Sequence, residues 1–252
     1  MTRSSSTKGS SVFEALAFDL DDTLYLERDY VASGFRATAA WCARTFGGDV
    51  ATIAADFARL FAEDSDGTVF DRWLVGRGIE RDLHLQALVA VYRDHDPQIL
   101  PVSGARACLV ELHRRYKLAL VTDGSTARQG AKLRALGLSE LFDAIIISDE
   151  IGPDAQKPDP RPFRLAAERL GVAPTRIVYL ADNPAKDFVG ARRAGLASIR
   201  VRLVGGLHRD RAPASAAYAP DAAIEILSAA AVEDAIQSIA RGGPVRAKPE
   251  GP

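Results

Sequence analysis

The chain has 252 residues, of which 47% are hydrophobic and 26% charged, a composition typical of a globular protein with one large domain or two modest ones. Its 33 acidic and 32 basic residues give a net charge of -1, which excludes a bulk attraction to nucleic acid or anionic lipid. Any site for an anionic ligand must therefore be local. The two cysteines, Cys42 and Cys108, lie in amphipathic helical patterns, so we expect buried thiols and no disulfide framework.

Both ends of the chain have the composition of loose segments. Residues 1–11 are polar and serine-rich, which predicts a disordered N-terminus that is neither a signal peptide nor a membrane anchor. Residues 241–252 are crowded with glycine and proline, which predicts a flexible C-terminal tail. Because no apolar run is long enough to span a bilayer, we expect a cytoplasmic protein with no membrane or nucleic-acid partner.

The first predicted strand ends in a concentration of negative charge. Val12–Tyr25 begins as an apolar run with strand character and stops abruptly at a polar cluster, Asp19, Asp21, Asp22 and Thr23. Carboxylates this close raise one another's pKa, so a fold keeps them together only if a cation or a hydrogen-bond network answers the charge. We interpret the cation as Mg²⁺ and Asp19 as a nucleophile.

Residues 26–98 differ in character from the strand before them. Alanine-rich helical periodicity appears and is broken at Gly47-Gly48, at residues 64–67 and around Gly76 and Gly78. No alternating strand pattern occurs in this segment. It is predicted to be an inserted domain of about four helices.

From Pro101 onward, strand and helix patterns alternate. Strands are predicted at Lys117–Thr122, Ala144–Ile147, Arg176–Ala181 and Ala197–Val201, helices at about 103–115, 126–136, 161–170 and 184–194, and a short strand and a helix within Pro220–Ala240. This order is typical of right-handed crossovers in a doubly wound parallel sheet with helices on both faces. We therefore expect an α/β core formed by residues 12–25 and 99–240.

Reactive side chains follow four of the predicted strands, at the end where ligands bind in open α/β sheets. They are Asp19 and Asp21, then Thr122-Asp123-Gly124, then Lys157, and finally Asp182 and Asp187. Turn formation or helix capping explains any one aspartate alone. Four strand ends that carry such residues together predict one site.

At these positions the sequence resembles the haloacid dehalogenase (HAD) superfamily of phosphohydrolases. Its four motifs are matched by Asp19-Leu-Asp-Asp-Thr23, by Thr122, by Lys157 in Gln-Lys-Pro-Asp-Pro, and by Asp182-Asn-Pro-Ala-Lys-Asp187. The likeness spans roughly residues 12–240. Ala181 precedes Asp182 where many relatives have glycine, and we expect no loss of function from so small a residue. The resemblance implies a Rossmann-like core and, for residues 26–98, a helical cap of the first type.

The resemblance also implies roles for the first and fourth motifs. Asp19 would attack phosphorus and hold the phosphoryl group as an acyl phosphate, and Asp21 would act as general acid and then general base. Mg²⁺ would be bound by the Asp19 side chain, the Asp21 backbone carbonyl and the Asp182 side chain, with Asp187 and Asn183 behind these ligands. Asp22 receives no chemical role and is interpreted as a turn residue leading into the cap.

The second and third motifs would bind the phosphate. Thr122 offers a hydroxyl, Gly124 lets backbone N–H groups approach closely, and Lys157 offers a positive charge. Asp123 is assigned to the same group, although a turn-forming aspartate before glycine explains it equally well. In the cap, we expect candidate contacts to the leaving group at Arg28, Arg36, Arg72 and Arg77, although surface solvation is the default for arginine.

The sequence thus predicts a Mg²⁺-dependent phosphatase that acts on a small phosphorylated metabolite, such as a sugar or acylsugar phosphate or a nucleoside monophosphate. A 2-haloacid dehalogenase of the same fold needs neither Mg²⁺ nor the second aspartate, so Asp21 argues against it. A phosphomutase shares all four motifs and stays open, as does a non-catalytic binding protein. The sequence does not indicate an oligomeric state.

Overall fold

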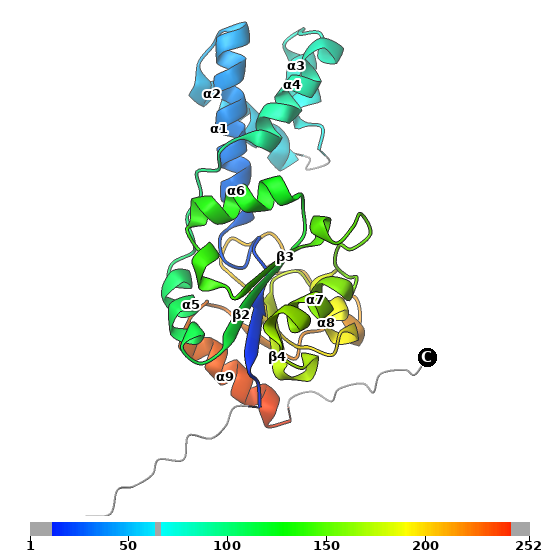
Figure 1. Cartoon of the computed structure of the whole chain (residues 1–252). Coiled ribbons are helices and arrows are strands. Elements are labelled where there is room, and N and C mark those ends of the chain that lie inside the picture. Colours follow the sequence, from blue (N-terminus) through cyan, green and yellow to red (C-terminus); the bar gives the residue numbers. More distant parts are fainter. Residues whose placement is uncertain (1–11, 64–66, 243–252) are drawn as a thin grey trace, which may run out of the picture.

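The computed structural model describes residues 12–63 and 67–242, so the predicted N-terminus 1–11 and all but the first two residues of the predicted tail 241–252 lie outside the described residues. Figure 1 shows an α/β core with a bundle of helices standing above one edge of its sheet. Within the described ranges, no helix combines the length and the apolar character needed to cross a membrane.

The core is built on a parallel sheet, which confirms the predicted fold class. Its strands are β1 Ala15–Phe18, β2 Lys117–Thr122, β3 Ala144–Ile147, β4 Ile177–Ala181, β5 Ala197–Val201 and β6 Ala222–Ile224. Over the described part of the chain the strand order is β3-β2-β1-β4-β5-β6, and each neighbouring pair is parallel. The first strand therefore lies at the centre, with Ala15 opposite both Lys117 and Ile177.

Helices cover both faces of the sheet. They are α5 Ala105–His113, α6 Thr126–Leu136, α7 Arg161–Leu170, α8 Asp187–Arg193 and α9 Ala229–Ala240. Leu16 and Phe18 of β1 face the cluster that includes α5 and α9, whereas Ala15 and Ala17 face the cluster that includes α7 and α8. All four side chains are buried, which is why this strand has a continuous apolar sequence instead of an alternating one.

The helices above the core are α1 Glu27–Phe46, α2 Val50–Glu63, α3 Val69–Gly76 and α4 Arg81–Asp94, and we call residues 27–94 the cap. The cap has its own hydrophobic core, in which Phe35, Phe57 and Trp73 are buried. Among the described residues this cluster has no member in common with the two clusters of the sheet, so most of the cap packs separately. Tyr30 of α1 is the exception, since it packs with the cluster of the sheet.

Two linkers join the cap to the core side by side. Asp22 adopts a left-handed backbone conformation with φ 52°, and its two carboxylate oxygens accept hydrogen bonds from the N–H groups of Glu27 and Leu207, both at 2.9 Å. The second linker returns beside the first, where the Val102 N–H donates to the Leu24 carbonyl at 2.9 Å. The predicted turn at Asp22 is thus the point where the start of α1 is attached to the core.

Candidate active site

The strand order brings the predicted site residues together at the C-terminal ends of the strands. Asp19 follows β1, Thr122 ends β2 and Asp182 follows β4, and these three strands are adjacent at the sheet centre. Lys157 comes from the loop between β3 and α7. Parallel neighbours end on the same side, so four segments that are distant in sequence converge there.

Three buried carboxylates lie close together in this site. Asp19, Asp182 and Asp187 each offer one oxygen, these oxygens lie within 4.8 Å of one another, and all three residues are buried. Burial raises the pKa of Asp19 to about 7, although the charge of Lys157 opposes the rise. Burial, together with the charges of Asp187 and Asp19, raises the pKa of Asp182 to about 9. Ionisation of the Asp182 carboxyl is therefore costly when no cation is bound.

The donor set of the three carboxylates fits a hard divalent cation. The Asp182 Oδ2 atom is buried and has no hydrogen-bond partner among the described residues, which is rare for a buried carboxylate oxygen. In contrast to Asp182, Asp187 has a partner at both carboxylate oxygens. Its Oδ2 accepts the Asn183 N–H at 2.9 Å, and its Oδ1 lies 2.8 Å from the Lys157 Nζ. Among these three carboxylates, Asp182 keeps a free oxygen for a divalent cation, whereas both oxygens of Asp187 have partners in the protein.

Lys157 provides the fixed positive charge of the site. Its Nζ lies 2.8 Å from Oδ1 of both Asp19 and Asp187 and donates to the Tyr179 hydroxyl at 2.9 Å. Burial alone would lower the pKa of Lys157, but the carboxylates of Asp187 and Asp19 raise it well above its usual value. Close packing fixes this position, because a Cβ at Gly190 of α8 would lie 2.8 Å from the Pro158 carbonyl oxygen.

The Asp21 side chain is not a member of this group of three carboxylates and is instead bound by three donors. Lys132 Nζ lies 2.6 Å from its Oδ1, Gln129 Nε2 donates to its Oδ2 at 3.1 Å, and the Tyr25 hydroxyl also donates to Oδ1. Burial would raise the pKa of Asp21, but the charge and hydrogen bond of Lys132 lower it below its usual value. A contribution of Asp21 to cation binding is therefore left to its backbone carbonyl.

Gln129 also orients Thr122. Its Nε2 donates to the Thr122 Oγ1 at 2.5 Å, which leaves the single hydroxyl hydrogen of Thr122 free to donate to a phosphate oxygen. Gly124 has φ 126°, a conformation that favours glycine, and a Cβ there would lie 3.3 Å from the Gln129 side chain.

Asp123 follows Thr122, and its side chain contacts the two loops that carry Lys157 and Lys186. Its Oδ1 accepts the Lys157 backbone N–H at 3.1 Å, and its Oδ2 lies 3.1 Å from the Lys186 Nζ. A carboxylate in this place would repel phosphate, so its two contacts favour the turn interpretation over phosphate binding.

The three residues that bind the Asp21 side chain had no role in the sequence prediction, namely Tyr25, Gln129 and Lys132. Gln129 and Lys132 lie on the buried side of α6 with Leu133 and Leu136. A glutamine and a lysine within the apolar stripe of an amphipathic helix were the signal that could have identified them, because buried polar groups need partners.

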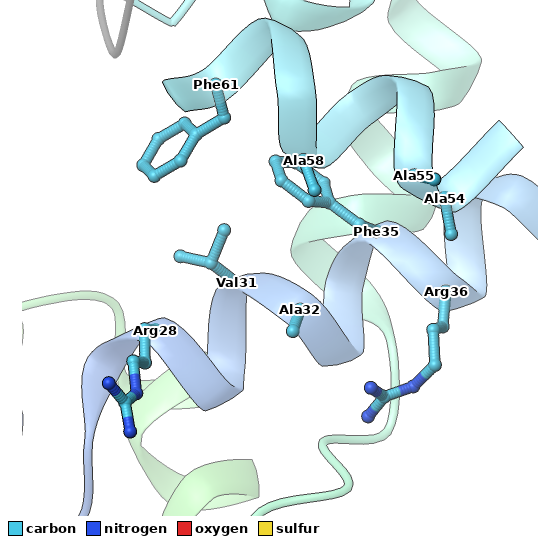
Figure 2. A pocket seen from close by; sticks show the side chains of 9 residues that line it. All are labelled: Arg28, Val31, Ala32, Phe35, Arg36, Ala54, Ala55, Ala58 and Phe61. Atoms are coloured by element: carbon cyan, nitrogen blue, oxygen red, sulfur yellow. The ribbon is translucent and has the colours of Figure 1, made fainter. Parts of the chain in front are cut away.

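The cap carries a groove of about 340 Å³ between α1 and α2. It is lined by Arg28, Val31, Ala32, Phe35, Arg36, Ala54, Ala55, Ala58 and Phe61, and Figure 2 shows both arginines projecting from α1. Arg28 also reaches the core, since a Cβ at Gly205 would collide with its guanidinium.

The other two candidate arginines pair within the cap. The Arg72 Nη2 lies 2.5 Å from the Glu63 Oε2. The Arg77 Nη2 lies 3.1 Å from the Asp56 Oδ2, and the Arg77 guanidinium stacks over the Trp73 ring. Of the four arginines considered from the sequence, Arg28 and Arg36 are thus the ones that line the groove.

Adding Mg²⁺ is expected to raise the melting temperature, and more so at about pH 8.5 than at about pH 5.5. The pKa of Asp182 is 3.8 in an unfolded chain and is raised to about 9 in the folded protein. The free energy of unfolding therefore falls as the pH rises between these two pKa values. A cation offsets that cost. At a 100-fold excess over its dissociation constant it adds about 2.7 kcal/mol, or about 5–10 °C.

Differential scanning fluorimetry at both pH values measures this effect. The Asp182→Asn variant serves as the control, because it removes the carboxylate with the raised pKa. Equal Mg²⁺-induced shifts in the parent at the two pH values would contradict the assignment.

Comparison with known proteins confirms the family predicted from the motifs. A family model described as haloacid dehalogenase-like hydrolase matches residues 13–195. Glyceraldehyde 3-phosphate phosphatase from Methanopyrus kandleri is 32% identical over 223 residues, which cover 85% of this chain and 94% of that protein. Phosphoserine phosphatase from Thermus thermophilus is 45% identical over 98 residues, 38% of this chain and 39% of that protein.

A solved structure shows the same fold. The HAD-hydrolase YfnB from Bacillus subtilis, bound to magnesium, matches with a TM-score of 0.62 and 23% identity over 85% of this chain and 95% of that chain. The predicted sheet, the four motifs in order and the family match agree with one another. The chain belongs to the haloacid dehalogenase-like hydrolase family.

Proposed function

We propose that the protein is a Mg²⁺-dependent phosphatase that hydrolyses a small phosphorylated metabolite through an aspartyl-phosphate on Asp19. The observation that carries the proposal is the buried group of Asp19, Asp182 and Asp187 beside Lys157, in which Asp182 Oδ2 has no hydrogen-bond partner among the described residues. A phosphatase needs such a concentration of charge to position a phosphoryl group and to stabilise its transfer.

In the first step Asp19 forms a bond to phosphorus. Lys157 engages Oδ1 of Asp19 and favours its ionised form, so the carboxylate is available as a nucleophile. The Thr122 hydroxyl donates to a phosphate oxygen. The bond between phosphorus and the leaving oxygen breaks, and the Asp21 carboxyl gives that oxygen a proton. Because the resting form of Asp21 is the carboxylate paired with Lys132, this carboxyl takes up its proton before the step.

In the second step water attacks the phosphorus of the aspartyl-phosphate. Asp21 takes the proton of this water, the bond between phosphorus and Asp19 breaks, and inorganic phosphate leaves. Asp19, Asp182 and the Asp21 backbone carbonyl would bind Mg²⁺, which supplies positive charge against the phosphate oxygens.

For the substrate we propose a small phosphate monoester that reaches the site from beneath the cap. The two named relatives act on glyceraldehyde 3-phosphate and phosphoserine, both three-carbon phosphates, which supports a small leaving group. The cap would exclude competing water, and Arg28, at the core end of the groove, is a candidate contact for the leaving group. We place the enzyme in the cytoplasm, acting on free metabolites without a nucleic-acid or membrane partner.

A panel of phosphorylated metabolites tests the proposal. Purified protein with Mg²⁺ is expected to release inorganic phosphate from at least one triose, amino-acid, sugar or nucleoside monophosphate, and to lose this activity in EDTA. Isomer formation without phosphate release would indicate a phosphomutase. Halide release from a 2-haloacid in EDTA would indicate a dehalogenase, and binding without turnover of any compound would indicate a non-catalytic protein.

A further inference from the structure

We propose that Lys132 is a positioning residue that fixes the Asp21 carboxyl and ties its orientation to the cap through Tyr30. This inference rests on the proposed function, in which Asp21 donates and accepts the proton. It gives a role to a lysine that belongs to none of the four motifs and lies on α6, the helix between the cap and the sheet in Figure 1.

The burial of Lys132 requires a compensating partner. Only 6% of the residue is exposed, and its Nζ lies 2.6 Å from Asp21 Oδ1. A buried ammonium without a partner is costly, and removing one member of such a pair leaves the other charge unanswered. The ion pair with Asp21 is therefore the contact that holds this lysine in the fold.

The same ion pair fixes the orientation of Asp21. Tyr25 and Lys132 bind Oδ1, and Gln129 binds Oδ2. The acceptor-only carboxylate also fixes the Gln129 amide, whose NH₂ group must face Asp21. Among these three donors Lys132 alone is charged, so we expect its removal to loosen the carboxyl most.

On its other side Lys132 contacts the cap. Its Nζ lies 4.3 Å from the centroid of the Tyr30 ring on α1, within the range of a cation–π interaction. Tyr30 in turn packs against His95, with ring centroids 4.9 Å apart, at the end of the cap. A displacement of the cap that moves Tyr30 would therefore remove one of the contacts that position the ammonium and leave those with Asp21 and the Tyr25 ring.

A positioning role predicts a dependence on the leaving group. An alkoxide leaving group is strongly basic and needs a proton from Asp21 as its bond breaks, whereas p-nitrophenolate leaves without one. Misplacing Asp21 should consequently slow alkyl phosphates far more than aryl phosphates. Loss of packing alone would slow both alike.

The experiment compares kcat on glycerol 3-phosphate and on p-nitrophenyl phosphate, both with Mg²⁺. Lys132→Met is expected to lower kcat about 100-fold on the alkyl ester and less than about 10-fold on the aryl ester, the scale of general acid–base catalysis. Lys132→Arg should recover part of the loss on the alkyl ester. Lys117→Met is the matched control, since that lysine binds only the Leu170 carbonyl among the contacts shown and should leave both rates unchanged.

Two variants of Tyr30 test the cap contact even if Lys132→Met fails to fold. Tyr30→Phe keeps the ring and should behave as the parent, whereas Tyr30→Leu should show the same selective loss on the alkyl ester, to a smaller degree. Combining Lys132→Met with Asp21→Asn should add nothing to the loss caused by Asp21→Asn alone, because both changes act on one group.

Equal losses on the two esters, or no loss on either, would overturn the inference. So would equal rates for Tyr30→Phe and Tyr30→Leu. A parent enzyme that hydrolyses neither ester nor any compound of the panel would instead refute the proposed function, so the two failures are distinguishable.

Discussion

Asp19→Asn is expected to abolish phosphate release, with a fall of at least about 10⁴-fold in kcat, the scale seen when a catalytic nucleophile is removed. An amide of the same shape cannot form the acyl phosphate. The fold should persist, because the change removes one negative charge from a buried group of three carboxylates in which the pKa of Asp19 is already raised by burial to about 7. Phosphate release and a thermal melt in EDTA measure the two effects.

Asp29→Asn is the matched control for this variant. It makes the same chemical change on an exposed residue of α1, and its activity should equal that of the parent. Turnover by Asp19→Asn at the parent rate would show that another group is the nucleophile.

Lys157→Met is expected to inactivate the enzyme and to lower the free energy of unfolding by about 3–5 kcal/mol in EDTA, the cost of breaking a buried ion pair. The change leaves Asp19 and Asp187 buried without the ammonium that lies 2.8 Å from each. Because the pKa of Lys157 is raised in the folded protein, its contribution is complete below the ordinary value of 10.5 and is lost as pH rises through the folded-state pKa. The loss should therefore be visible throughout the neutral range.

Urea denaturation at neutral pH in EDTA measures this loss, with Lys186→Met as the comparison. Lys186 pairs with Asp123 at the same edge of the sheet, but its side chain is 36% exposed, so its removal should cost less than about 1 kcal/mol. If the two variants have the same stability, the ammonium of Lys157 does not hold the carboxylates together.

The fold could be predicted closely wherever pattern and chemistry agree. The strands at Lys117–Thr122 and Ala144–Ile147 have the predicted bounds, because β-branched and apolar runs are interrupted there by polar turns. The predicted helix at 184–194 begins instead at Asp187. Asn183 forms a turn first, in which its Oδ1 accepts the Ala185 N–H at 2.9 Å, and periodicity contains no signal for such a side-chain turn.

The site could be predicted where its residues follow strands, since strand ends are fixed by the sheet. Asp19, Lys157 and Asp182 are brought together as the alternating pattern led us to expect. Lys132 was missed because a lysine on a helix is ordinarily solvated. It is buried against Asp21 and Tyr30, which both lie about a hundred residues earlier, and such contacts cannot be read from local spacing.

The central place of β1 constrains the order in which this protein can assemble. Its two neighbours in the sheet begin at Lys117 and Ile177, so a growing chain offers the first strand no partner until about a hundred further residues exist. The cap helices contact one another within residues 27–94, and α1 with α2, α2 with α3 and α3 with α4 are neighbours in sequence, so these contacts close smaller loops at lower entropic cost. The carboxylates proposed to bind the cation, Asp19 and Asp182, thus come together only when these long-range strand contacts form.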